Sequence, residues 1–183
     1  MAMVHLARMI RESAASFGSK EAMRYRDAEG WRSISYAELS TRVDAMARAL
    51  VSAGIEAGDR VALFAPNGPD WAIADFGILT AGAVGVPIYA TDTARQAEQV
   101  FLDSGAKLVF VGGQEQHDKA AAFESGPPAL VAFDPATRLS GKGSSSLADF
   151  LARAPPESAA EVERRFAAAS LAALATIIYT SGA

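Results

Sequence analysis

Hydrophobic and polar positions follow two periods along the chain, one typical of helices and one of strands. Apolar residues recur at helical spacing over residues 4–17, and Gly18 is placed to end a helix there. Residues 22–26 then alternate in polarity, a turn sequence occupies 27–30, and residues 31–36 return as a second extended run. This pattern predicts an amphipathic helix followed by a two-stranded hairpin.

Two helix starts are marked by the same spacing of polar residues. Ser35 with Glu38, and Thr93 with Gln96, fit the capping box, in which each side chain accepts a backbone N–H at the start of a helix. After the first box, an apolar stripe runs to Leu50 and Gly54 can end the helix. We therefore expect a long helix after the hairpin and a second capped helix after residue 93.

Short apolar runs alternate with helical patterns from residue 61 onward. The runs have the character of strands buried on both faces of a parallel sheet and cover 61–64, 84–89, 108–111 and 130–133. The patterns between them predict helices over 70–80, after residue 93 and over 114–123. Strands that alternate with helices predict an α/β fold with a parallel, doubly wound sheet, flanking helices and the short hairpin at its amino end.

The carboxyl-terminal third has a different composition. Residues 134–169 are rich in Gly, Ser, Ala, Glu and Pro, so we expect a loop and linker region there, with a short helix near 147–154 and a second linker over 155–169. A last strand is predicted over 174–179. We expect residues 1–183 to form one amino-terminal subdomain.

Composition narrows the class of function. Half of the 183 residues are hydrophobic and the formal net charge is −4, without long runs of one sign, so neither nucleic acid nor an anionic membrane surface is indicated as a partner. The chain has no cysteine, which excludes disulfides and thiolate chemistry. No signal peptide and no transmembrane segment are indicated, and we expect a cytoplasmic protein.

Most isolated candidates for chemistry have an ordinary structural explanation. The stretch 141–146 has the composition of a phosphate loop but not its spacing, so a surface loop is favoured. His5 and His117 lack ligand spacing, which favours exposed or helix-face positions over metal binding or catalysis. Trp31 and Trp71 are expected in the core. We expect no metal ligands and no catalytic residues within the chain.

The last residues carry one weak candidate for phosphate binding. Thr180, Ser181 and Gly182 directly follow the predicted strand, and small residues with hydroxyl groups and accessible backbone N–H groups suit phosphate oxygens. Taken alone, these residues are better explained as an ordinary turn at the end of a strand.

Several motifs that occur in order along the chain favour phosphate binding over an ordinary turn. Through them the chain resembles the long-chain fatty-acid–CoA ligases, within the larger family of adenylate-forming acyl-CoA synthetases. The motifs, in order, are WRSISYAEL (31–39), GIEAGDRV (54–61), NGPDW (67–71) and GAVGVPIY (82–89). Residues 89–96 and 103–107 resemble the long-chain branch in particular. The resemblance covers nearly the whole chain.

The resemblance implies that Thr180, Ser181 and Gly182 begin a loop of the form [YF]-T-S-G-[ST]-[ST]-G-x-P-K-G, which binds the phosphates of ATP. Ala183 departs from the Ser or Thr of that pattern: either the protein lacks this hydroxyl group, or the sequence is cut at that point. The implied enzyme uses ATP, Mg²⁺ and CoA, and converts a fatty acid to acyl-AMP and then to acyl-CoA. Its adenine, ribose, magnesium and catalytic lysine contacts belong to segments beyond this chain.

Two alternatives to a long-chain ligase stay open. The enzyme could belong to another branch, for short-chain or aromatic acids or for loading a carrier protein, or the chain could be a freestanding α/β binding module. A homo-oligomer and peripheral association with a membrane are also compatible with the sequence. If the chain is the amino-terminal part of a long-chain ligase, residues 1–183 alone are expected to be inactive and to bind no cofactor tightly.

Overall fold

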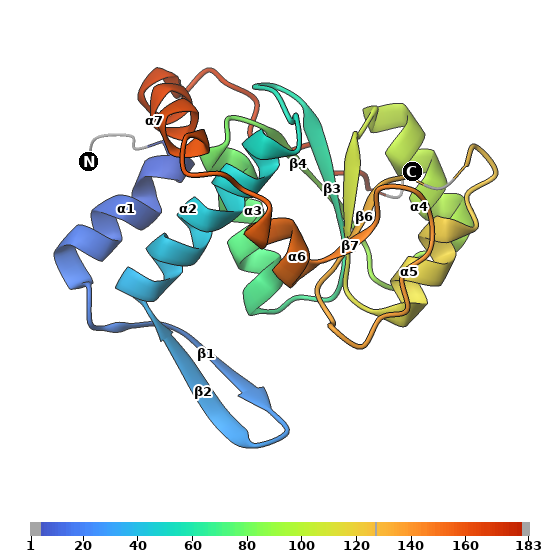
Figure 1. The fold of residues 1–183 in the computed structure, drawn as a ribbon, viewed down its shortest axis with the longest axis horizontal. Coiled ribbons are helices and arrows are strands. Elements are labelled where there is room, and N and C mark those ends of the chain that lie inside the picture. Colours follow the sequence, from blue (N-terminus) through green and yellow to red (C-terminus); the bar gives the residue numbers. More distant parts are fainter. Residues whose placement is uncertain (1–4, 127, 181–183) are drawn as a thin grey trace.

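The computed structural model describes residues 5–126 and 128–180, and it has three layers with a sheet in the middle (Figure 1). The first half contains α1 (Leu6–Phe17), β1 (Glu21–Asp27), β2 (Gly30–Ser35), α2 (Tyr36–Ser52), β3 (Arg60–Phe64), α3 (Pro69–Thr80) and β4 (Val84–Ile88). The second half contains α4 (Ala94–Ser104), β5 (Leu108–Val111), α5 (Gln114–Ala121), β6 (Leu130–Ala132), β7 (Ser145–Ser146), α6 (Leu147–Ala152) and α7 (Ser158–Ala168).

The main sheet has five parallel strands in the order β4-β3-β5-β6-β7. Val61 in β3 lies opposite Gly85 on one side and Leu108 on the other. The chain thus places β4 on one side of β3 and then crosses to add β5 on the other, with helices on both faces. This arrangement confirms the predicted doubly wound α/β fold, and the antiparallel β1–β2 hairpin projects from it (Figure 1).

Two hydrophobic clusters hold the layers together, one on each face of the sheet. The larger joins α1, α2, α3, α6 and α7 to one face, and its Phe110 and Phe150 rings meet edge to face with centroids 5.7 Å apart. The smaller joins α4 and α5 to the other face around Phe64 and Val86. Both β3 and β5 are buried on both faces, which explains why their sequences are continuous runs of apolar residues.

Both predicted capping boxes are present. The N–H of Glu38 donates to Ser35 Oγ at 3.2 Å, and the N–H of Ser35 donates to Glu38 Oε2 at 2.9 Å. Thr93 and Gln96 make the same pair of bonds at the start of α4. Gly105 ends α4 with φ 61°, the left-handed conformation that glycine adopts without strain. The predicted short helix after residue 146 is also confirmed, as α6.

The predicted second linker over 155–169 is wrong, because most of it is helix α7. Its composition resembled a linker, but Val162 and Phe166 lie one helical turn apart, and Val162 is buried in the larger cluster. Arg11 in α1 stacks over the Phe166 ring at 4.2 Å and pairs with Glu163 at 2.7 Å. These tertiary contacts stabilise a helix that its composition did not indicate.

The prediction for Trp31 is wrong, whereas the predicted helix position of His117 is confirmed. Trp31 was expected in the core but is 69% exposed, because it lies on the outer face of the hairpin opposite Arg26. His117 was expected to be exposed or on a helix face; it lies on α5 but is 1% exposed. Its Nε2 accepts the N–H of Ser140 at 3.0 Å and its Nδ1 lies 2.9 Å from Asp118 Oδ1. His117 therefore ties the β6–β7 connection to α5.

The predicted strand over 174–179 is formed only in part. A single parallel bridge joins Thr176 to Gly85 in β4, and the neighbouring described residues have no regular secondary structure. The segment thus lies along the outer edge of β4 without becoming a full sixth strand. Among the described residues, no helix is long and apolar enough to cross a membrane.

Candidate functional site

Open parallel sheets bind ligands at the carboxyl ends of their strands, usually where the chain switches direction. In this sheet the switch lies between β3 and β5. There the N–H of Gly112 donates to the carbonyl of Phe64 at 3.1 Å, and a Cβ added to Gly112 would lie 2.6 Å from Cδ of Pro66. The Pro66 ring thus packs closely against Gly112 at this point.

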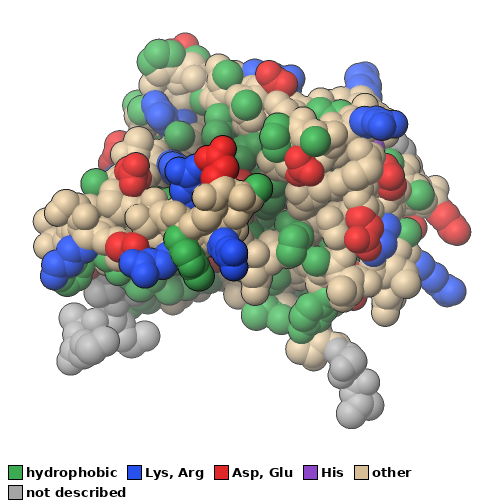
Figure 2. All heavy atoms as spheres, turned by 90° about the horizontal axis from the view of Figure 1, so that it is seen from below, with side chains coloured by type: hydrophobic (Ala, Val, Ile, Leu, Met, Phe, Trp, Pro, Cys, Tyr) green, Lys and Arg blue, Asp and Glu red, His purple; other side chains and the backbone are tan. Residues whose placement is uncertain are grey.

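A cleft opens one strand away, at the carboxyl ends of β3 and β4. It has a volume of about 410 Å³ and is lined by Ala65, Pro66, Asn67, Trp71, Pro87, Ile88, Tyr89, Ala90, Thr91, Ile178 and Tyr179. Most of these side chains are apolar or aromatic. In the view from below, hydrophobic side chains lie across the middle of the molecule, with charged side chains both among them and around them (Figure 2).

The segment 174–180 forms one wall of this cleft. The N–H of Gly85 donates to the carbonyl of Ala175 at 3.1 Å, and the carbonyl of Gly85 accepts the N–H of Ile177 at 3.0 Å. Because the bridge is parallel, the segment runs in the same direction as β4 and brings Thr180 to the carboxyl edge of the sheet. Thr180 is exposed there. The predicted site residues Ser181 and Gly182 lie outside the described residues.

The last described turn of the chain is also fixed by a side chain. The Tyr179 hydroxyl donates to Oδ2 of Asp103 in α4 at 2.6 Å, and the Tyr179 ring packs against the smaller hydrophobic cluster. Burial, together with the Asp103 carboxylate, raises the pKa of Tyr179 to about 12. The hydroxyl therefore keeps its proton, and remains a donor, at neutral pH.

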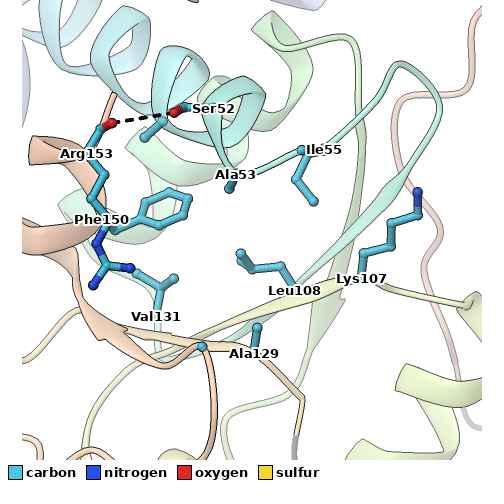
Figure 3. Close-up of a pocket in the computed structure, with 12 residues that line it drawn as sticks. Ser52, Ala53, Ile55, Lys107, Leu108, Ala129, Val131, Phe150 and Arg153 are labelled. Carbon is cyan, nitrogen blue, oxygen red and sulfur yellow. Dashed lines mark hydrogen bonds between the residues drawn. The ribbon is translucent and has the colours of Figure 1, made fainter. Parts of the chain in front are cut away.

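A second cavity, of about 270 Å³, lies at the opposite edge of the sheet between α2, α6 and the amino ends of β5 and β6 (Figure 3). Lys107 at its rim pairs with Asp59 at 2.7 Å. Partial burial acts to raise the pKa of Asp59, but hydrogen bonds from Lys107 and from the N–H of Glu56 hold it below its usual value. The lysine is thus already engaged, and the cleft beside Thr180 is the stronger candidate.

Residues 10–183 match the family model described as AMP-binding enzyme. The chain belongs to this family. The AMP-binding enzymes include adenylate-forming acyl-CoA ligases, and the curated relatives agree. The long-chain-fatty-acid–CoA ligase FadD15 of Mycobacterium bovis is 36% identical over 152 residues, which cover 83% of this chain and 25% of that protein. The chain thus spans about a quarter of the length of this relative.

Solved structures of AMP-binding enzymes share the fold. An acyl-CoA synthetase from Brucella canis matches with a TM-score of 0.72 and 23% identity, over 83% of this chain and 28% of that one. A benzoate CoA ligase from Burkholderia xenovorans matches with a TM-score of 0.68 and 24% identity, over 84% of this chain and 29% of that one. At these identities the likeness establishes the fold alone.

Sequence reasoning found the position of Thr180 but missed the residues around it. Trp71 was expected only in the core; it packs against the larger cluster and also lines the cleft. Tyr89 was expected only as the end of a strand, and Asp103 only as part of a motif. Their roles depend on which strand carries the outer edge of the sheet, and a single sequence does not specify that order.

Proposed function

We propose that this chain is the amino-terminal part of a long-chain fatty-acid–CoA ligase. The observation that carries the proposal is the docking of 174–180 along β4, which delivers Thr180 to the carboxyl edge beside an apolar cleft, in a chain of the AMP-binding family. In the proposed reaction, a fatty-acid carboxylate oxygen attacks the α-phosphorus of ATP and pyrophosphate leaves. The sulfur of CoA then attacks the acyl carbon, and AMP leaves with the bonding electrons.

The proposed role of Thr180, Ser181 and Gly182 is to hold the phosphates of ATP. Hydroxyl groups on Thr180 and Ser181 and the backbone N–H groups of all three residues are donors that suit phosphate oxygens. Gly182 adds no side chain that would keep a phosphate at a distance. Mg²⁺, when bound with ATP, would offset the phosphate charge, and phosphoryl chemistry depends mainly on such positioning and charge stabilisation.

The long-chain preference rests on a narrower basis than the family. It is supported by the 36% identity to a protein named as a long-chain-fatty-acid–CoA ligase. A benzoate CoA ligase shares the fold, so aromatic acids are the alternative substrate class. The same proposal covers a cytoplasmic location, a subdomain spanning residues 1–183, and no activity of residues 1–183 alone.

The test uses the full-length enzyme, meaning the product of the whole reading frame in which this chain lies. Acid-dependent exchange of pyrophosphate into ATP is measured with octanoate, palmitate and benzoate. We expect the highest kcat/KM with palmitate. Thr180→Ala and Ser181→Ala should each raise the KM for ATP about tenfold, the cost of a hydrogen bond to a charged group.

Ser33→Ala is the matched control. It also removes one hydroxyl group, but from the exposed face of the hairpin, and it should leave every KM unchanged. A higher kcat/KM with benzoate than with palmitate would indicate that the substrates are aromatic acids and not long-chain acids. An absence of exchange with all three acids would contradict acyl adenylation by this enzyme.

A further inference from the structure

One contact fixes the chain immediately before the proposed phosphate-binding residues. The Tyr179 hydroxyl and Asp103 Oδ2 lie 2.6 Å apart, although 76 positions separate the two residues in the sequence. Tyr179 is the direct neighbour of Thr180. The contact therefore joins helix α4 to the last residue before Thr180, beyond the point where the backbone bonds to Gly85 end.

Asp103 lies where an acidic side chain is unfavourable for its own helix. It belongs to the last turn of α4, which ends at Ser104, and no basic residue lies in that turn. The partial negative charge at a helix carboxyl end repels a carboxylate. The side chain is also exposed, so it contributes little to the core. The favourable interaction of this carboxylate is the hydrogen bond that it accepts from the Tyr179 hydroxyl.

A tyrosine is well suited to the other side of this contact. Its ring packs against the smaller hydrophobic cluster, which fixes the direction of the side chain, while its hydroxyl reaches Asp103 at the surface. A hydrogen bond to a charged acceptor is stronger and more directional than one between neutral groups. The ring and the bond together restrict the backbone of residue 179 in position and rotation.

We propose that Asp103 is a positioning residue for the phosphate-binding segment: through the hydroxyl of Tyr179 it sets the point and direction from which Thr180 leaves the sheet. This inference rests on the proposed function, and it adds a residue 77 positions before Thr180 that touches neither substrate nor cofactor. Asp103 does not react. It acts only by reducing the number of conformations from which ATP must select the binding one.

The test compares four variants of the full-length enzyme in pyrophosphate exchange: Tyr179→Phe, Asp103→Ala, Asp103→Asn and the double variant Tyr179→Phe/Asp103→Ala. Tyr179→Phe and Asp103→Ala should each raise the KM for ATP about three- to tenfold, as expected for one partly exposed hydrogen bond to a charge. The KM values for the acid and for CoA should stay unchanged. The double variant should be no worse than either single one, because both remove the same bond.

Asp103→Asn separates positioning from general stability. Its amide oxygen still accepts the Tyr179 hydroxyl, so we expect the KM for ATP to rise less than twofold. Asp103→Ala removes a charge that the helix end repels, so its melting temperature should stay within about 2 °C of the wild type while ATP binding weakens. Tyr25→Phe, which removes a hydroxyl group from the hairpin, is the control and should change nothing. A merely structural contact would instead lower the melting temperature and alter all KM values together.

Hydrogen exchange of the 176–180 amides provides a readout that does not need activity. We expect faster exchange there in Tyr179→Phe than in the wild type. If the wild-type enzyme shows no pyrophosphate exchange, the proposed function fails, and the contact is then judged on hydrogen exchange alone. Equal exchange in both proteins, or ATP KM values within twofold of the wild type for Asp103→Ala, would overturn the positioning role.

Discussion

The N–H of Gly85 in β4 donates to the carbonyl of Ala175 at 3.1 Å, across 90 residues of sequence. The carbonyl of Gly85 completes the contact by accepting the N–H of Ile177 and the hydroxyl of Thr176. This one glycine therefore sets the register between the outer edge of the sheet and the segment that leads to Thr180.

A side chain at position 85 would meet Asp75. A Cβ built on Gly85 lies 3.0 Å from Asp75 Oδ1 in α3, so the carboxylate must shift to admit it. Gly85→Ala should lower the free energy of unfolding by about 1 kcal/mol. In an Asp75→Ala background the same change should be neutral or stabilising by about 0.5 kcal/mol, because alanine is favoured over glycine within a strand. Urea unfolding measures both, and equal costs in the two backgrounds would exclude the contact.

Asp75 should also make stability depend on pH. Burial raises the pKa of Asp75 above its ordinary 3.8, so the folded protein retains this proton to a higher pH than the unfolded chain. The free energy of unfolding therefore falls as the pH rises through the window between 3.8 and the raised pKa. Asp75→Asn should be more stable than the wild type at pH 7 by about 0.5 kcal/mol, a small figure because water still reaches this side chain. The difference should vanish at pH 3, and a difference that persists there would contradict this explanation.

Arg165 in α7 connects three parts of the fold. Its Nη1 donates to the carbonyls of Ile55 at 2.7 Å and Ala81 at 3.1 Å, and its Nε donates to Glu161 at 2.6 Å. Arg165→Ala should lower the free energy of unfolding by about 2 kcal/mol, because it leaves two carbonyls without this donor. Arg164→Ala is the control: Arg164 pairs with the same Glu161 but is exposed, so its removal should leave the free energy of unfolding nearly unchanged. Equal losses in urea unfolding would argue against the role of the two carbonyl contacts.

His117 should control access to the β6–β7 connection. His117→Leu removes the acceptor for the N–H of Ser140 and leaves that group without its partner. Trypsin can cleave this connection after Arg138 and Lys142, so its digestion rate reports opening. We expect cleavage on the order of tenfold faster than in the wild type. Asp118→Asn, which keeps the bond between His117 and Ser140, should be cleaved at the wild-type rate; fast cleavage in both variants would show that the bond does not matter.

Local signals were sufficient to predict most of the elements. The capping boxes at Ser35 and Thr93 depend on neighbouring residues only, and both are present. Helix α7 could not be predicted in this way, because its stability comes from Arg11 and Arg165, which join it to distant parts of the chain. Tertiary contacts of this kind outweigh a composition rich in Ala, Glu and Pro.

The position of the candidate site along the sequence could be predicted, but the residues that surround it could not. Because a strand must end where its loop begins, the sequence located Thr180 at the end of an extended segment. The cleft beside it depends on the position of Pro66, which lines it, and on the docking of the segment at the edge of β4. Both depend on the order of strands in space. Ser181 and Gly182, outside the described residues, stay a prediction.

The most direct test of the central claim is palmitate-dependent exchange of pyrophosphate into ATP, measured on the full-length enzyme, on its Thr180→Ala variant and on residues 1–183 alone. We predict exchange by the full-length enzyme, a KM for ATP about tenfold higher in the variant with the KM for palmitate unchanged, and no exchange by residues 1–183. Exchange by residues 1–183 alone, or an unchanged KM for ATP in Thr180→Ala, would contradict the account.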